Sequence, residues 1–477
     1  MLFPTLSFGL FFLAVFPLAW LLRRAATARK IMLLVASYAF YASWDWRFMG
    51  LLAGSSTLNY VAGLLLLACR SERQKSWVTG IAVALNLGVL GFFKYYGFFL
   101  DSLAGLLAPW GLDRDLPFLE IILPVGISFF TFHGISYVVD VRRGEVEACR
   151  SPLDLFLYIS FFPQLVAGPI VRAAYFLPQL KRHPELDRGT LAHGIVLILA
   201  GLLKKTVVAS ILATDIVDPA FMDPASYGSL DLLVAIYAYA VQIYCDFSGY
   251  TDIAIGVAGL LGYSFKPNFN QPYRAVSLQD FWRRWHMSLS QWLRDYLYKP
   301  LGGSRHGELM TYRNLLLTML LGGLWHGAAW TFVLWGAIHG GVLSLERLVR
   351  TRLWPGVWTA RGVLGAVLSG LGILLTFHVV CLAWIFFRSP DLATATAYLS
   401  GLAGGGLAPQ LTTPLVAGLV AATLAAQLLL PAEGSRLIAR RIEGLGAIWL
   451  GLILGLGLAL IHALGPEGVA PFIYFQF

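Results

Sequence analysis

Apolar runs of about 20 residues recur from one end of the chain to the other, and this recurrence limits the folds open to it. Each run is long enough to cross the ~30 Å hydrocarbon core of a bilayer. Only 13% of the 477 residues are charged, whereas soluble proteins average about 25%. A spanning segment must satisfy its own backbone hydrogen bonds, and these runs do not alternate polar with apolar residues. We therefore predict an all-α polytopic membrane protein.

Basic residues beside the apolar runs predict the orientation of the chain. Arg23 follows the first run, Lys75 the third and Arg142 the fifth. Such residues favour the cytoplasmic face, which places the N-terminus outside. Arg436 precedes the last run, so we expect the C-terminus outside as well. The first run, Leu2 to Leu22, lacks a cleavage-site pattern and is expected to remain as the first span.

We expect a single membrane domain over residues 1–477, because no loop is long enough to fold alone. It divides into N-terminal spans (1–140), a motif-bearing core (152–345), C-terminal spans (361–464) and an exposed aromatic tail (465–477). We predict a ring of about eleven or more spans, with re-entrant and interfacial helices, around a central funnel.

The composition also limits the kinds of cofactor and binding partner that we expect. Four scattered cysteines show no metal-ligand spacing, so neither a disulfide framework nor a metal site is expected. The net charge of +9 comes from Lys and Arg beside apolar runs. No pattern typical of nucleic-acid binding is visible, so the expected partner of these charges is the lipid bilayer.

One histidine stands inside the long apolar segment from Tyr312 to Leu345. Its neighbours are small or aromatic: Gly322, Gly323, Trp325, Gly327 and Trp330. A histidine at membrane depth is costly without partners or water, which makes His326 a functional candidate. The glycines then give clearance to a ligand; the alternative is that they serve helix packing. His339 lies about 220° further round a continuous helix and is expected on another face.

Charged residues interrupt two other apolar stretches. Lys204 and Lys205 lie in the middle of 187–214 and are expected to end a half-helix or line a wet cavity; the alternative is that both reach a nearby surface. Asp246, Ser248 and Asp252 interrupt 230–263. We expect Asp252 to cap the following helix, and for Asp246 capping and the orientation of a catalytic group both remain open.

A loop rich in Pro and Asn (266–276) leads to residues 277–298, which fit one amphipathic helix. On a helical wheel Phe281, Trp282 and Trp285 share an apolar arc, and Arg283 lies outside it. His286 falls at the edge of that arc, where it can point into the protein. The alternative is an ordinary interfacial residue.

Four motifs in this order resemble the membrane-bound O-acyltransferase family, most closely the bacterial branch typified by the alginate O-acetylase. They are FPQLVAGPI (162–170), YCDFSGYTD (244–252), FWRRWHMSLS (281–290) and GLWHG (323–327). The resemblance covers most of the chain and implies two histidine positions in a funnelled core. They match His326, the invariant one, and His286.

The resemblance implies acyl transfer from a thioester to a hydroxyl. A hydroxyl needs a base at neutral pH, and imidazole has a pKa near about 6.5. His326 would be that base, and His286 would orient it or the acceptor, or stabilise the oxyanion. Trp325, Asp246, Ser248, Gly323 and Gly327 would support the site, and Trp-walled surroundings would protect the thioester from water.

The chain ends in Phe-x-Tyr-x-x-Phe, similar to the C-terminal motif of the small partner protein in teichoic-acid D-alanylation. Tyr474 is therefore a candidate acyl carrier that presents the group outside. The alternative is an aromatic belt that anchors the terminus.

The sequence thus predicts an inner-membrane O-acyltransferase that supplies acetyl groups to an exopolysaccharide such as alginate. We expect no bound cofactor, acetyl-CoA or another thioester as donor, and a periplasmic polysaccharide acetyltransferase or acceptor protein as partner. Lys204, Lys205, Lys299 and Arg305 would attract the donor's phosphates. The alternatives are peptidoglycan O-acetylation, teichoic-acid D-alanylation, and a transporter without covalent chemistry.

Overall fold

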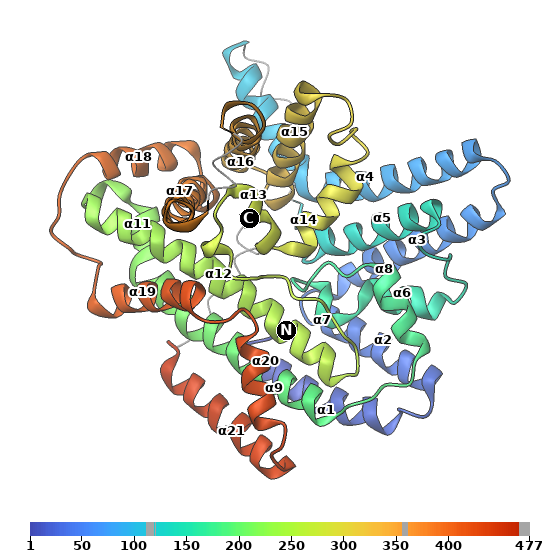
Figure 1. Ribbon diagram of the computed structural model, residues 1–477. Helices are drawn as coiled ribbons and strands as arrows, with labels where there is room; N and C mark the ends of the chain where they lie inside the picture. Colours follow the sequence, from blue (N-terminus) through green and yellow to red (C-terminus); the bar gives the residue numbers. More distant parts are fainter. Residues whose placement is uncertain (111–118, 120, 355–360, 467–477) are drawn as a thin grey trace. The chain divides into compact units, whose positions relative to one another are not determined.

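The computed structural model describes residues 1–110, 119, 121–354 and 361–466. Every regular element in these ranges is helical, as the long apolar runs predicted. The chain divides into two compact units: residues 1–187 with 257–266, and residues 188–256 with 267–477. Figure 1 traces the elements along the chain.

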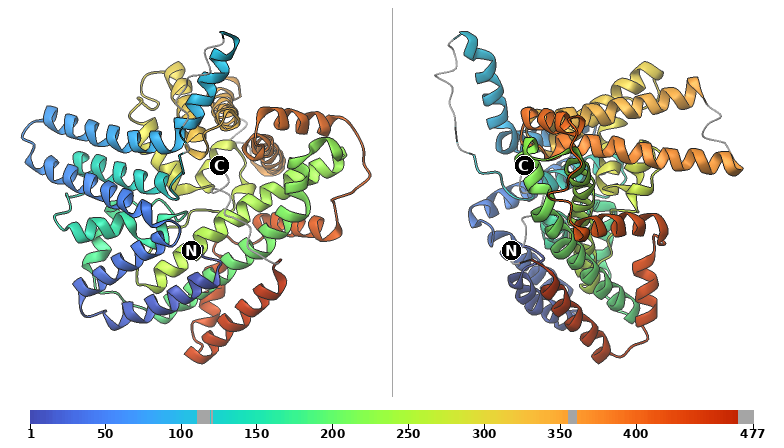
Figure 2. Two further views of the ribbon diagram at one scale, coloured as in Figure 1. Left: turned by 180° about the vertical axis from the view of Figure 1, so that it is seen from behind. Right: turned by 90° about the vertical axis from the view of Figure 1, so that its left-hand side faces the viewer.

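The first unit is built on long helices near the N-terminus, of which α3, α4 and α5 pack against one another (Figure 2). Ser71 and Gln74 form a capping box that begins α4. Its helices are α1 (Leu6–Leu21), α2 (Ala26–Ala42), α3 (Met49–Ala68), α4 (Glu72–Leu107), α5 (Ile127–Arg143), α6 (Pro152–Ser160), α7 (Phe162–Leu165) and α8 (Ala173–Phe176), with 3-10 turns η1 (Trp46–Phe48), η2 (Ala108–Trp110) and η3 (Leu177–Lys181).

The second unit holds every described residue of the predicted site. Its helices are α9 (Arg188–Leu202), α10 (Ser210–Leu212), α11 (Asp218–Met222), α12 (Ser229–Leu260, the last four residues counting with the first unit), α13 (Leu278–Arg284), α14 (Met287–Leu293), α15 (Glu308–His326), α16 (Trp330–Leu348), α17 (Gly362–Arg388), α18 (Leu392–Ala403), α19 (Pro414–Leu429), α20 (Gly434–Ile442) and α21 (Ala447–Leu464). Short π-helical turns are η4 (Leu203–Ala209), η5 (Ala213–Val217), η8 (Arg294–Tyr298) and η9 (Val349–Leu353); η6 (Pro224–Ser226) and η7 (Pro272–Arg274) are 3-10 turns.

Seven helices in the described ranges are long and apolar enough to cross a membrane, or eight if the bent pair α19 and α20 counts as one. The count of eleven or more is therefore not confirmed. The expected first, second and fifth spans form α1, α2 and α5, of 16, 17 and 17 residues, which do not meet this measure.

Two local predictions about the helices are wrong. Lys204 and Lys205 do not end a half-helix; they lie in the π turn η4 inside a helical stretch that continues to Met222. Asp252 caps nothing, because α12 runs unbroken through both aspartates. The YCDFSGYTD segment and the apolar residues on both sides of it form one helix.

Candidate active site

His326 is the last residue of α15, and the chain turns back at once into α16. Gly327 is extended and ends the helix, and Ala329 is extended before Trp330 begins the next one. Helices α15 and α16 pack along each other as a hairpin (Figure 1). The break explains why His339 does not follow the continuous-helix prediction: it returns on α16 toward the same neighbourhood.

Glycines allow the two helices of this hairpin to approach closely. A Cβ on Gly323 would collide with the Phe332 carbonyl, and one on Gly336 with the Met319 carbonyl. A side chain at Gly327 would collide with the Phe332 ring. The chain itself fills the space at Gly323 and Gly327, so these glycines serve helix packing, and the prediction that they give clearance to a ligand is wrong.

Aromatic rings enclose His326, which is 4% exposed. Its ring centroid lies 5.0 Å from that of Trp325, 5.0 Å from Trp335 and 5.3 Å from Phe387, each approached edge to face. Trp330, expected as a wall, is 55% exposed. Rings at these distances exclude water from the imidazole, which protects a reactive ester or thioester.

His286 lies at a break between two short helices. The predicted helix over 277–298 is wrong as a single element: α13 ends at Arg284, Trp285 is extended, and His286 adopts the left-handed backbone (φ 41°) before α14. A non-glycine residue pays about 1–2 kcal/mol for that conformation. The break turns the imidazole fully inward, with 0% exposure.

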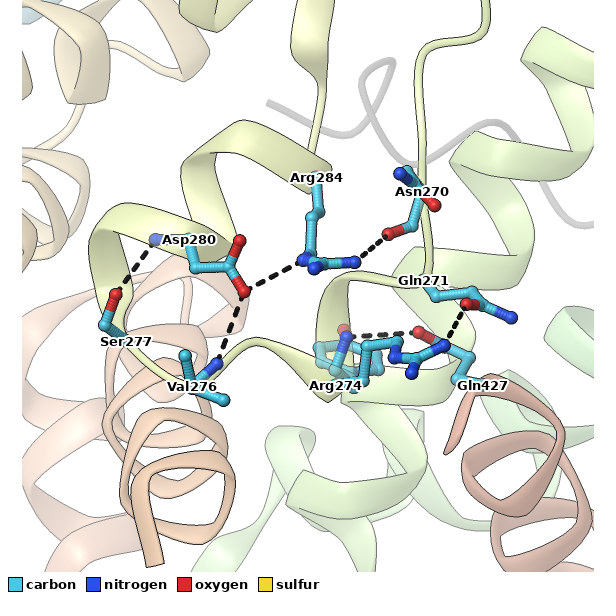
Figure 3. Close-up of polar contacts among 9 residues, drawn as sticks. Asn270, Gln271, Arg274, Val276, Ser277, Asp280, Arg284 and Gln427 are labelled. Atoms are coloured by element: carbon cyan, nitrogen blue, oxygen red, sulfur yellow. Dashed lines mark hydrogen bonds and ion pairs between the residues drawn. The ribbon is translucent and has the colours of Figure 1, made fainter. Parts of the chain in front are cut away.

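The segment before α13 holds this break in place. The backbone N–H of Asn270 donates to the Arg284 carbonyl at 2.8 Å. Figure 3 shows the Arg284 side chain paired with Asp280 at 2.9 Å and donating to the Asn270 carbonyl at 3.4 Å. Ser277 caps α13 by accepting from the Asp280 N–H. The two ends of the break are therefore fixed by bonds to the loop and to the helix start.

Trp325 joins the two histidines. Its ring centroid lies 6.1 Å from that of His286 and 5.0 Å from that of His326. Phe247 of α12 approaches His286 from another direction, at 4.6 Å edge to face. The structure therefore brings together, around one tryptophan, the two imidazoles that the sequence singled out from segments 40 residues apart.

Burial determines the protonation state of His286. It lowers the pKa of this imidazole to about 3, because the charged form loses its hydration among apolar rings. At neutral pH His286 is an uncharged hydrogen-bonding group.

Both lysines of η4 are engaged by carboxylates of α12. Lys205 pairs with Asp246, and both side chains are buried. Lys204 lies 2.5 Å from Asp252 and 3.0 Å from the Ser248 hydroxyl. These contacts occupy four residues predicted for donor binding or catalysis. Arg305 is exposed on the turn after η8.

A cavity of about 440 Å³ opens elsewhere in the same unit. Four arginines line it: Arg283, Arg294, Arg347 and Arg350. Arg294 and Arg347 are paired with carboxylates, and Arg350 donates to the neutral Gln279 amide. Among the residues that the structure describes, Arg283 has no ion-pair partner. The lining also includes the carboxyl group of Glu346, and the four arginines still leave positive charge in excess.

One residue of the cavity lining connects the cavity to the rings around the histidines. Trp282 lines it and donates from Nε1 to His339 Nδ1 at 3.3 Å. His339 lies 4.5 Å from Trp335, which in turn contacts His326. A lining with both arginines and Trp282 suits a ligand with an anionic end and a less polar reactive end.

Comparison with known proteins identifies the family. The model of the membrane-bound O-acyltransferase family matches residues 76–386. The chain is 42% identical to the probable alginate O-acetylase AlgI of Azotobacter vinelandii, over 83% of this chain and 74% of that protein. It is 38% identical to the Pseudomonas putida protein of the same name, over 94% of each. A peptidoglycan O-acetyltransferase of Helicobacter pylori is 37% identical, over 79% of this chain and 74% of that protein.

This chain belongs to the membrane-bound O-acyltransferase family. It is an O-acyltransferase, as the four motifs predicted, and a multi-pass membrane protein. No group of three or more His, Cys, Asp or Glu residues in the described ranges has a geometry that would hold a metal ion.

Sequence patterns missed several residues around the histidines of this acyltransferase. Trp335 and His339 come from the segment expected to form one continuous helix with His326, and the missed break brings them back to it. Phe387 comes from a helix expected to be separate, and Asn268 from a segment predicted only as a loop. The run Pro-Asn-Phe-Asn before the FWRRWH motif is the one local signal for Asn268, because Asn favours side-chain bonds to nearby backbone. Tyr474 lies outside the described residues.

Proposed function

We propose that this acyltransferase transfers acetyl groups from a cytoplasmic thioester for the O-acetylation of an exopolysaccharide, alginate, in the bacterial inner membrane. The observation that carries the proposal is the buried pair His326 and His286 around Trp325. The names of the most similar relatives support the polymer. Partner proteins outside the membrane would complete the modification of the polymer.

His326 acts as the general base. It removes the proton from the attacking hydroxyl as the new C–O bond forms. The C–S bond of the thioester then breaks, and the proton passes from His326 to the thiolate, which leaves as the thiol. The ring shell of Trp325, Trp335 and Phe387 keeps water from competing for the acyl group. A positioned base contributes about 10²–10⁴-fold.

The test is ester analysis in cells that lack the gene and carry it back as wild type or His326→Ala. We expect the variant to abolish acetyl esters on alginate, while an exposed-histidine control, His306→Ala, restores them. Normal alginate esters in the His326→Ala cells would remove the catalytic assignment. If the wild-type gene restored esters on peptidoglycan or teichoic acid instead, the polymer would be wrong.

The cavity supports acetyl-CoA as the donor. Its lining includes Arg347 and Arg350 at the end of α16, and basic residues beside an apolar helix favour the cytoplasmic face. The excess charge of Arg283 and Arg350 fits the phosphates of coenzyme A, and these residues replace the set predicted from sequence. Lys204 and Lys205 are less suited to this role, because aspartates already pair with both.

Kinetics of the reconstituted protein test this donor site. Arg283→Ala with Arg350→Ala should raise KM for acetyl-CoA roughly tenfold, the effect of losing charge-assisted bonds. The double variant should also lose the preference for acetyl-CoA over its 3′-dephospho form. Arg305→Ala, which removes an exposed arginine outside the cavity lining, is the matched control. An unchanged preference in the double variant would contradict the donor site.

Tyr474 is proposed as an acyl relay, on the strength of the sequence motif alone. Its phenol would receive the acetyl group and present it to a periplasmic transferase. An acetyl ester on Tyr474, trapped by mass spectrometry, would support this step. Full polymer acetylation by Tyr474→Phe would rule it out.

A further inference from the structure

The two ring nitrogens of His286 have different surroundings. Nδ1 lies 3.3 Å from the side-chain oxygen of Asn268. Nε2 is buried and has no hydrogen-bond partner among the residues that the structure describes. A buried polar atom left without a partner costs about 1–3 kcal/mol. This asymmetry points to a bound group that satisfies Nε2.

The backbone determines which atom of the Asn268 amide faces His286. The N–H of Ser288 donates to the same atom at 3.0 Å, and the Ser288 hydroxyl lies 2.9 Å from it. A backbone N–H is only a donor, so this atom is the oxygen Oδ1 and not the amide nitrogen. Asn268 is 2% exposed and cannot exchange this bond for water.

The main chain of Asn268 is held by the same break in the helix. Its carbonyl accepts the N–H of Met287 at 2.9 Å. Asn268 therefore bonds to the residues just after His286 with both its backbone and its side chain. The position of Oδ1 relative to the imidazole follows from these bonds and does not depend on the imidazole itself.

The tautomer of His286 follows from this geometry. An amide oxygen only accepts, so Nδ1 must carry the proton that it donates to Oδ1. In the neutral imidazole the other nitrogen then holds a lone pair and no proton. The neighbouring rings of Phe247 and Trp325 carry no charge that would stabilise a second proton. Nε2 is thus an acceptor.

We propose that Asn268 is a positioning residue that fixes His286 as the Nδ1–H tautomer, so that Nε2 accepts a hydrogen bond from a hydroxyl of the acyl acceptor adjacent to the reacting one. This inference rests on the proposed function with the polysaccharide, and not the single phenol of Tyr474, as the acceptor at the site, because a polysaccharide supplies such neighbouring hydroxyls. His326 still removes the reacting proton. A neutral His286 in this tautomer has no donor at Nε2, which excludes stabilisation of the oxyanion by that atom.

Nitrogen-15 solid-state NMR of the full-length protein in bilayers tests the tautomer without any activity. The His286 signals are those missing from a histidine-labelled His286→Gln sample. We expect a protonated Nδ1 and an unprotonated Nε2 in the wild type at neutral pH. Asn268→Asp keeps the shape and the acceptor but adds a negative charge, so the pKa of His286 should rise and both nitrogens should become protonated at a higher pH than in the wild type. A wild-type spectrum with a protonated Nε2 would overturn the proposal.

A pH profile separates positioning from a structural role. In Asn268→Asp the imidazolium cannot accept, so KM for the acceptor should rise about tenfold as the pH falls through the raised pKa of His286, and should recover at higher pH where His286 loses its added proton. Ser288→Ala keeps the Asn268–His286 bond and should stay within about twofold of wild type. A uniform loss at every pH would contradict the inference. If polysaccharide is not the acceptor, activity fails for the wild type too, whereas the NMR result stands.

Discussion

At the scale of the residue, the site depends on one backbone conformation. His286 points inward because it leaves the helix in the left-handed region, and its neighbours Asn268 and Asn270 supply the bonds that hold the exit. The imidazole then enters a shell of rings that disfavours charge. The left-handed backbone of His286 thus determines both where its imidazole points and that the imidazole is uncharged at neutral pH.

The pKa shift of His286 predicts how stability depends on pH. Its folded pKa, about 3, lies below the ordinary value of 6.5. Between these values the unfolded chain binds a proton that the folded chain does not, so stability falls as the pH drops below 6.5, by up to about 1.4 kcal/mol per pH unit. Above that range the group contributes no pH dependence.

Thermal unfolding of the detergent-solubilised protein measures this effect. Lowering the pH from about 7 to about 5 should reduce Tm less in His286→Asn than in the wild type, because the amide does not titrate. Other buried histidines, His133 and His339, are common to both samples and cancel. Equal losses of Tm would show that the pKa of His286 is the same in the folded and the unfolded protein.

This residue also shows a limit of sequence analysis. The wheel placed His286 at an inward-facing edge, and it is buried. The wheel could not reveal the break, because the residues on both sides are compatible with a continuous helix. The bonds that favour the break come from Asn268 and Asn270, earlier in the chain. A helical wheel of residues 277–298 does not include these two residues and so cannot show the bonds.

At the scale of the element, two ion pairs join η4 to α12, beside a close contact between two glycines. A Cβ at Gly201 would lie 2.5 Å from the Gly249 carbonyl, and one at Gly249 would lie 2.7 Å from the Gly201 carbonyl. This approach brings Lys204 and Lys205 to the carboxylates of α12. The sequence indicated costly charges in both helices; it did not show that they neutralise each other.

Removal of one member of the buried pair should destabilise the protein strongly. Asp246→Asn leaves the buried Lys205 without its counter-charge and should cost about 3–5 kcal/mol, whereas Lys205→Met combined with Asp246→Leu should be near neutral. Lys204→Met removes a partly exposed charge and should cost about 1 kcal/mol. Unfolding in detergent measures all three.

Activity of the double variant then decides what the pair does. If the stable Lys205→Met, Asp246→Leu protein transfers acetyl groups normally, the pair joins helices and Asp246 has no catalytic part. If it is stable and inactive, Asp246 orients the site, the alternative that the sequence left open.

At the scale of the whole molecule, ion pairs and basic clusters constrain which helices cross the membrane. Arg347 at the end of α16 pairs with Glu308 at the start of α15, 2.8 Å apart. These two helix ends therefore lie at the same face. Since α16 is long and apolar enough to cross, α15 must return the chain across the bilayer, although it is not among the seven helices that meet the measure of length and hydropathy.

The C-terminal spans follow the same logic. After Arg350 the chain crosses in α17, and the bent pair α19 and α20 turns by 84°. The short α20 carries Arg436, Arg440 and Arg441, which favour the cytoplasmic interface. That placement requires α19 to cross back, and α21 then ends outside. We therefore expect α19 to be a span and α20 to lie along the interface.

Single cysteines in a cysteine-free background test this arrangement. The four native cysteines are unpaired, so their replacement breaks no disulfide. Gly307→Cys, Thr351→Cys and Glu443→Cys should react with an impermeant thiol reagent only from the cytoplasmic side of vesicles, and Asp391→Cys only from the opposite side; all four positions are exposed. Labelling of Glu443→Cys from outside would show that α19 does not cross. Opposite labelling of Gly307→Cys and Thr351→Cys would contradict the Glu308–Arg347 pair, and with it the hairpin that holds His326.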